Sequence, residues 1–221
     1  MAIPKHIFQT FKTKKLPLIT RMHIWNMKRK NPDYEYFLFD DQDIQEFFKK
    51  EFPSEYITAY NQLTIGAAKA DFFRYAILYK KGGVYLDIDS GMSRSLKYLI
   101  QPDDVALLSR ERHIGLFCQW GLIFEKHHPF LKKTLEIVLD NIQTHRFPND
   151  VHATTGPTAF TKAVNECIVD DPTISYRIFD GIEYRGYLKF KYKLGKFFLY
   201  NKKSEHWKQK QLTQDIIKRT E

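Results

Sequence analysis

Apolar and polar positions follow two patterns along the chain, short apolar runs and longer segments with spaced apolar residues. The short runs, rich in β-branched and aromatic residues, predict strands at 3–8, 34–39, 84–86, 105–108, 122–124, 176–179 and 196–200. The longer segments predict helices at 19–30, 42–50, 65–81, 130–144 and 158–167, with a short helix around Tyr56. This alternation of strands and helices is typical of an α/β sandwich with a mostly parallel central sheet.

Local signals mark several helix ends. Asp40 and Asp41 are suited to cap the helix at 42–50, because a carboxylate accepts hydrogen bonds from the amides of a first turn. Gly82 and Gly83 follow the helix at 65–81, where glycine commonly ends a helix. The chain shows no internal repeat and no low-complexity linker. We therefore expect one domain over residues 1–221.

Charge narrows the choice of partners. The 221 residues are 43% hydrophobic and carry 35 Lys and Arg against 26 Asp and Glu, a formal net charge of +9. Such a balance favours anionic partners, among them nucleotides, phosphorylated lipids and an acidic membrane face. Nucleic acid would fit the charge but requires a motif beyond basicity. We find no such motif and expect no nucleic-acid partner.

Cysteine use and hydropathy bear on the cellular compartment. Cys118 and Cys167 are far apart and lack CxxC spacing, which argues against a disulfide scaffold or a zinc site. No run approaches the roughly 20 apolar residues of a membrane helix. The N-terminal sequence MAIPKHIF lacks the apolar segment of a signal peptide. We expect a cytoplasmic protein, in peripheral contact with an anionic membrane at most.

The stretch GGVYLDIDSG at 82–91 is the strongest candidate for chemistry. Its apolar strand ends at Asp87 and Asp89, and open α/β sheets bind ligands beyond the carboxyl ends of their strands. Residues two apart on an extended segment point to the same side, so both carboxylates would converge. Because two close carboxylates repel each other, a cation such as Mn²⁺ or Mg²⁺ would stabilise the pair. A solvated acidic loop is the alternative interpretation.

Two other classes of protein site also contain an Asp-x-Asp motif and are alternatives to this interpretation. A calcium loop that begins at Asp87 requires an acidic ligand at its twelfth position, where the chain has Tyr98. A phosphatase of the haloacid-dehalogenase type requires Thr or Val where Gly91 stands, and its motif normally begins the fold. The calcium loop is therefore excluded. A magnesium-dependent phosphatase or phosphotransferase that uses Asp87 and Asp89 is kept as the alternative function.

Residues 67–89, AAKADFFRYAILYKKGGVYLDID, resemble the core signature of glycosyltransferase family 32. These Asp-x-Asp sugar transferases include yeast-type mannosyltransferases and bacterial capsule and lipooligosaccharide enzymes, and more distantly resemble the glucosylating clostridial toxins. IPKHIFQTF at 3–11 is similar to the opening strand of the family, and NPDYEY at 31–36 with FDD at 39–41 to its second strand. TGP at 155–157 and HW at 206–207 resemble two later landmarks. The likeness covers the first hundred residues well and the rest thinly.

The resemblance implies a GT-A-like, Rossmann-type fold and a metal-dependent, retaining enzyme. Such an enzyme would move a hexose from a UDP- or GDP-linked donor to a glycan or lipid-linked saccharide, in polysaccharide or glycoconjugate biosynthesis. The nucleotide-sugar and metal-binding half would span 1–110 and the acceptor side 111–207. Residues 208–221 would form a basic C-terminal tail.

The same resemblance assigns roles to particular residues. Asp89 would bind Mn²⁺ or Mg²⁺ directly, with Asp87 beside it contacting the ribose, a sugar hydroxyl or metal-bound water. His206 would complete the coordination sphere. Asp71 and Arg74 share a helix face, and by resemblance they would bind hydroxyls of the donor sugar. An ordinary helical ion pair is the alternative for these two.

Further contacts with the donor nucleotide are expected from Gln9, Thr10, Tyr85 and Trp207. For the aromatic residues, a place in the core is the competing interpretation. No nucleophile can be named from the sequence, and the catalytic residue is left open. Glu125 and Asp150 are carboxylates to which the sequence assigns no place, so neither is named as the nucleophile. A front-face attack steered by the leaving phosphate would require no such carboxylate.

Overall fold

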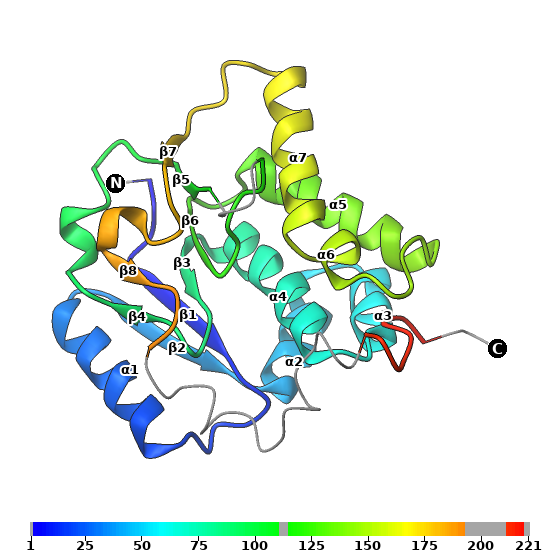
Figure 1. Ribbon diagram of the computed structural model, residues 1–221, viewed down its shortest axis with the longest axis horizontal. Helices are drawn as coiled ribbons and strands as arrows, with labels where there is room; N and C mark the ends of the chain where they lie inside the picture. Colours follow the sequence, from blue (N-terminus) through cyan, green and yellow to red (C-terminus); the bar gives the residue numbers. More distant parts are fainter. Residues whose placement is uncertain (1, 111–114, 193–210, 219–221) are drawn as a thin grey trace.

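A six-stranded sheet forms the centre of the protein, in the order β2-β1-β3-β6-β5-β7 (Figure 1). The computed structural model describes residues 2–110, 115–192 and 211–218. Strand β6 runs antiparallel to its neighbours β3 and β5, while the other three pairings are parallel. The predicted mostly parallel sheet is confirmed. The strands are β1 (His6–Thr10), β2 (Glu35–Phe39), β3 (Gly83–Leu86), β5 (Ala106–Ser109), β6 (Gly121–Phe124) and β7 (Arg177–Phe179).

Helices flank the sheet, as the sequence predicts. They are α1 (Leu18–Lys30), α2 (Asp41–Glu51), α3 (Ser54–Gln62), α4 (Gly66–Lys81), α5 (Pro129–Gln143), α6 (Val151–Thr154) and α7 (Pro157–Asp170). Among the helices of the described residues, none has the length and apolarity to cross a bilayer.

Several short elements give no periodic signal and were not predicted. They are α6, the 3₁₀ turns Leu96–Tyr98 and Tyr184–Gly186, and a second sheet of β4 (Gly91–Met92) and β8 (Leu188–Lys189). Two to four residues are too few to show a repeat of 2 or 3.6. The strand predicted at 196–200 lies outside the described residues.

The two faces of the sheet pack against two separate hydrophobic clusters. Tyr85 and Leu108 face the larger cluster, with residues of α2 to α5 and α7. Val84 and Leu107, their neighbours in sequence, face the smaller cluster, to which α1 contributes Met27. Side chains alternate between faces along a strand, so neighbouring apolar residues enter opposite layers. The runs VYL and ALL are apolar throughout because both faces are covered.

Gly82 and Gly83 fix the position of β3 beside β1. Gly82 ends α4 with a φ of +62°, and Gly83 has a φ of +114°, a region that side chains disfavour. A Cβ on Gly83 would lie 2.8 Å from the carbonyl oxygen of His6. Both glycines are required because the chain reverses and then approaches another backbone closely. Strand β3 starts at this turn, which determines where Asp87 emerges.

Two other sequence predictions, the capping of α2 and the basic tail at 208–221, are confirmed only in part. Asp40 caps α2, accepting hydrogen bonds from the backbone amides of Gln42 and Asp43, whereas Asp41 lies inside the first turn. Near the C-terminus we expected a polar, basic tail over 208–221. Instead, Ile216 and Ile217 are fully buried in the larger cluster. An apolar pair that close to the end of a basic segment serves as an anchor for the chain.

Candidate donor and metal site

Asp87 and Asp89 lie at the carboxyl end of β3, in a turn. The Asp87 amide donates to the carbonyl oxygen of Trp120 at 2.8 Å, and the Ser90 amide donates to the carbonyl oxygen of Asp87 at 2.9 Å. The backbone therefore folds back immediately after the strand. Our premise of an extended Asp-x-Asp segment is wrong, because Asp89 is part of this turn.

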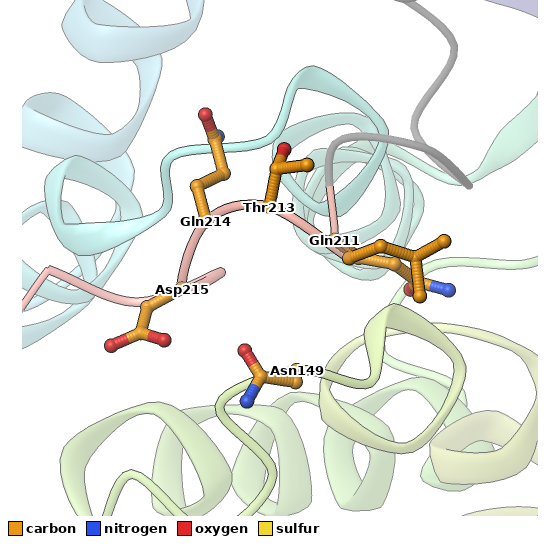
Figure 2. Close-up of a pocket in the computed structure, with 6 residues that line it drawn as sticks. Asn149, Gln211, Thr213, Gln214 and Asp215 are labelled. Carbon is orange, nitrogen blue, oxygen red and sulfur yellow. The ribbon is translucent and has the colours of Figure 1, made fainter.

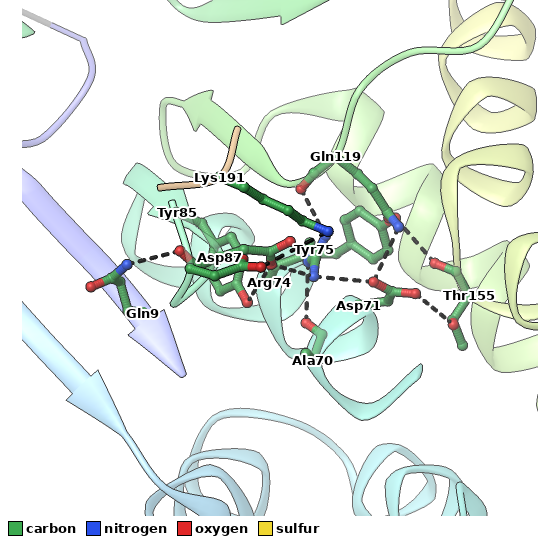
Figure 3. Close-up of polar contacts among 11 residues, drawn as sticks. Gln9, Ala70, Asp71, Arg74, Tyr75, Tyr85, Asp87, Gln119, Thr155 and Lys191 are labelled. Atoms are coloured by element: carbon green, nitrogen blue, oxygen red, sulfur yellow. Dashed lines mark hydrogen bonds and ion pairs between the residues drawn. The ribbon is translucent and has the colours of Figure 1, made fainter. Parts of the chain in front are cut away.

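A lysine nevertheless gives both carboxylates a common neighbour. Lys191 Nζ lies 3.9 Å from Asp89 Oδ2, and the side chain of Asp89 is 10% exposed. Burial raises the pKa of Asp87, while the positive charges of Arg74 and Lys191 oppose that rise. Lys191 extends toward Asp87 in Figure 3. A cation already compensates this acidic pair.

Arg74 joins the aspartates of α4 and the β3 end into one buried network (Figure 3). Its Nη2 lies 2.8 Å from Asp87 Oδ1 and 3.1 Å from Asp71 Oδ1. Its Nη1 donates to the carbonyl oxygen of Gln119 at 2.8 Å. The side chains of Arg74 and Asp71 are each 5% exposed. This pair is therefore no ordinary surface ion pair, because its third member comes from the Asp-x-Asp motif.

Asp71 has two further partners from distant segments. Gln119 Nε2 donates to Asp71 Oδ1 at 3.1 Å, and Thr155 Oγ1 donates to Oδ2 at 3.0 Å. Tyr75 Oη donates to Gln119 Oε1 and to the carbonyl oxygen of Thr155. Burial raises the pKa of Asp71 to about 7, against the opposing charge of Arg74. The network fixes Asp71 in one orientation.

Two residues predicted to contact the nucleotide instead support the network. Tyr85 is 1% exposed, and its ring lies 4.8 Å from the Arg74 guanidinium. Gln9 is also 1% exposed; its Nε2 donates to the carbonyl oxygen of Asp87 at 2.9 Å, and its Oε1 accepts from Tyr36 Oη. Both are positioning residues, since burial leaves no surface for a nucleotide. Thr10 donates to the carbonyl oxygen of Phe39, at the same sheet edge.

The structure separates the two unplaced carboxylates from this site. Because β6 is antiparallel, Gly121 pairs with Leu86, and Glu125 follows β6 at the opposite end of β3. Asp150 caps α6, where its Oδ1 accepts from the Ala153 amide at 3.1 Å. Neither carboxylate joins Asp87. The predicted metal ligand His206 and the predicted nucleotide contact Trp207 lie outside the described residues.

The ligand atoms that the Asp-x-Asp motif offers are suited to a hard divalent ion. Asp87 and Asp89 supply carboxylate oxygens, the ligands that Mg²⁺ and Mn²⁺ prefer. Over the described residues, no group of three or more His, Cys, Asp or Glu gathers around a point. Two carboxylates suffice for such an ion because it retains waters and binds substrate phosphates. These two residues would hold the cation.

A separate surface pocket contains none of the predicted site residues (Figure 2). It has a volume of about 410 Å³ and is lined by Asn149 and residues 211–215. Its wall is polar, and it is formed where the C-terminal segment passes Pro148 and Thr64. The buried charged network, not this pocket, is therefore the candidate site.

Known proteins share this sequence region. A family model described as "Glycosyltransferase sugar-binding region containing DXD motif" matches residues 21–106. Inositol phosphoceramide mannosyltransferase 3 of Schizosaccharomyces pombe is 35% identical over 162 residues, which are 71% of this chain and 43% of that protein. The initiation-specific alpha-1,6-mannosyltransferase of Candida albicans is 26% identical over 202 residues, 74% of this chain and 52% of that protein. The chain spans about half the length of these curated relatives.

A solved structure shares the fold. The PaToxG glycosyltransferase superposes with a TM-score of 0.63 at 21% identity, covering 77% of this chain and 70% of that one. This likeness confirms the GT-A-like α/β architecture predicted from the sequence. The resemblance carried by residues 67–89 is confirmed as well: this chain contains the DXD-bearing sugar-binding region of the glycosyltransferases.

Proposed function

We propose that the protein is a metal-dependent glycosyltransferase that moves a hexose from a nucleotide sugar to a glycan or lipid-linked acceptor. The observation that carries the proposal is the network of Asp71, Arg74 and Asp87 beside Asp89, at the carboxyl end of β3. Both curated relatives are named mannosyltransferases. Mannose is therefore the first sugar to test, with GDP-mannose as its donor.

The residues of the network suit the charges of such a reaction. A sugar nucleotide leaves as a diphosphate, and a bound divalent cation would stabilise the negative charge that develops on it. Asp87 and Asp89 would hold that cation. Lys191, 3.9 Å from Asp89 Oδ2, adds a second positive charge at the same place. Arg74 fixes the Asp87 carboxylate, so its orientation does not have to be organised during the reaction.

Asp71 is the residue that we assign to the donor sugar. Asp71 is 4% exposed, so a sugar hydroxyl would reach its carboxylate by taking the place of Gln119 Nε2 or Thr155 Oγ1 as a hydrogen-bond donor. Retention of the anomeric configuration is part of the proposal. Glu125 follows β6 at the far end of β3, and Asp150 caps α6, so neither of these two carboxylates belongs to the network. We therefore favour front-face attack.

The alternative, a phosphatase of the haloacid-dehalogenase type, has less support. Strand β3 follows two strands and four helices, whereas the phosphatase motif normally begins its fold. The buried Asp71–Arg74 pair also has no role in the phosphatase pattern. The family match covers the Asp-x-Asp segment itself.

A donor screen tests the proposal. The thermal midpoint and nucleotide release are measured with GDP- and UDP-hexoses in Mn²⁺, Mg²⁺ or EDTA. A donor at a hundred times its Kd stabilises the fold by about 2.7 kcal/mol, which raises Tm by roughly 5–10 °C for a chain of this size. The shift and the release should both require the metal, and the product should keep the anomeric configuration of the donor.

Two variants sharpen the screen. Asp89→Asn should abolish the metal-dependent shift, because it removes one of two carboxylates. Asp180→Asn is the matched control, since that side chain is 94% exposed. Metal-dependent release of phosphate from simple esters, with no shift from any nucleotide sugar, would overturn the proposal and favour the phosphatase.

A further inference from the structure

Helix α1 carries three large apolar side chains that face away from the protein. Leu18, Met22 and Trp25 are 71%, 57% and 64% exposed. They are spaced four and three residues apart, so they form one stripe along the helix. We call these three residues the α1 stripe. Single exposed apolar residues are common, but an aligned trio that includes a tryptophan marks an interaction surface.

The charges on helix α1 itself have one sign. The helix LITRMHIWNMKRK contains no acidic residue, and Arg21, Lys28 and Arg29 are exposed beside the stripe. The Arg29 guanidinium lies 5.3 Å from the ring of Trp25. The loop before the helix adds Lys12 and further lysines. The surface therefore combines apolar side chains with a positive rim.

The opposite face of α1 is firmly attached to the protein. Thr20 is fully buried, and its Oγ1 hydrogen-bonds to Tyr192 Oη at 2.8 Å. The ring of His23 stacks on the Tyr192 ring with 3.9 Å between centroids. Lys30 Nζ donates to the carbonyl oxygen of Met92 at 2.7 Å. Helix α1 lies at the periphery of the molecule (Figure 1), and these contacts hold it in place beneath the stripe.

We propose that the α1 stripe and its basic rim dock the protein on the surface of an anionic lipid bilayer. Tryptophan, leucine and methionine insert at the boundary between headgroups and acyl chains, where tryptophan is enriched. Arginine and lysine around them attract anionic headgroups. A second copy of this chain would place the same basic rims against each other. Charge complementarity therefore favours a bilayer over self-association.

Docking through α1 would also place the candidate site close to the bilayer. The Tyr192 side chain contacts α1, while the Tyr192 amide donates to the carbonyl oxygen of Asp89 at 3.0 Å. One residue thus connects the helix to the Asp-x-Asp turn. A lipid-linked acceptor would meet the site at the membrane surface. This consequence rests on the proposed function, whereas the binding to lipid does not.

Vesicle co-sedimentation tests the docking. The protein is mixed with phosphatidylcholine vesicles, with or without phosphatidylserine, and the partition coefficient is measured over a range of salt. We expect binding to the anionic vesicles that weakens with salt. Serine at all three positions of the α1 stripe should lower the partition coefficient by roughly a hundredfold, and Arg21→Gln with Arg29→Gln by roughly tenfold.

Control measurements distinguish an effect on lipid binding from an effect on folding and from an effect on the proposed activity. Val169→Ser removes an equally exposed apolar side chain, 79% exposed, from the distant helix α7 (Figure 1). It should bind vesicles like the wild type, and all variants should keep the wild-type Tm. Nucleotide release without vesicles reports on the proposed function alone. Equal binding by the triple-serine variant, no binding by the wild type, or a dimer that this variant dissociates would each refute the docking.

Discussion

Replacement of Arg74 by methionine would leave two carboxylates without their shared counter-charge. In the structure its guanidinium contacts Asp71 and Asp87 and donates to the carbonyl oxygen of Gln119, at 2.8 to 3.1 Å. The side chain is only 5% exposed, so water cannot replace these contacts without entering the core. Methionine fills much of the same volume. The effect of the change is therefore electrostatic rather than a cavity.

The expected loss is large because one partner of a buried charge network is removed. Breaking a buried pair in this way costs about 3–5 kcal/mol. Asp87, with 29% of its side chain exposed, is partly solvated, so we expect the lower end of that range, about 3 kcal/mol. Arg74→Lys keeps the charge but loses the planar fork that reaches three acceptors, and should cost about half as much.

Urea unfolding at neutral pH measures this loss as the change in free energy of unfolding. Arg146→Met is the control, since Arg146 also pairs with an aspartate at 2.8 Å but is 47% exposed. An exposed pair of this kind contributes about 0–1 kcal/mol. If Arg74→Met destabilised the protein no more than Arg146→Met, the network would not be a buried charge cluster. Arg74→Lys gives the same comparison if the methionine variant does not fold.

Three further predictions concern the metal site, the strand junction and pH. Lys191→Met should tighten Mn²⁺ binding roughly fivefold in calorimetry, because an ammonium group near Asp89 competes with the ion; weaker binding would contradict this. Gly83→Ala should lower the free energy of unfolding, measured in urea, by about 2–3 kcal/mol, because a Cβ would clash with the carbonyl oxygen of His6. Gly66→Ala is the control and should raise this free energy slightly, because a Cβ at that position meets open space. Burial lowers the pKa of His128 to about 4 in the native state. In the unfolded state the pKa of this histidine is about 6.5, so the unfolded state binds a proton at a higher pH than the native state does. The contribution of His128 to stability should therefore fall by up to about 3 kcal/mol as pH decreases from 6.5 to 4, whereas Asp71, with its raised pKa, contributes with the opposite sign over this range. His128→Asn keeps a capping group, so the difference in stability between the wild type and this variant isolates the His128 contribution; a difference that does not change with pH would contradict the prediction.

The local part of the site could be predicted from the residues alone. Apolar runs, helix periodicity and the Gly82-Gly83 pair predicted α4, β3 and the place where Asp87 emerges, because each signal depends on neighbouring residues. The Asp71–Arg74 spacing on one helix face was readable for the same reason. The resemblance of residues 67–89 to a glycosyltransferase signature lies within that single helix-turn-strand unit.

The distant residues that complete the site are brought together by the packing of the folded chain. Thr155 is 84 positions from Asp71, and Gln119 reaches it because β6 enters the sheet antiparallel to β3. Lys191 comes from the segment after β8, a strand too short to leave a pattern. Burial likewise turned Tyr85 from a predicted nucleotide contact into a support for the network. Strand order and burial are properties of the packed chain, and no local pattern of residues encodes them.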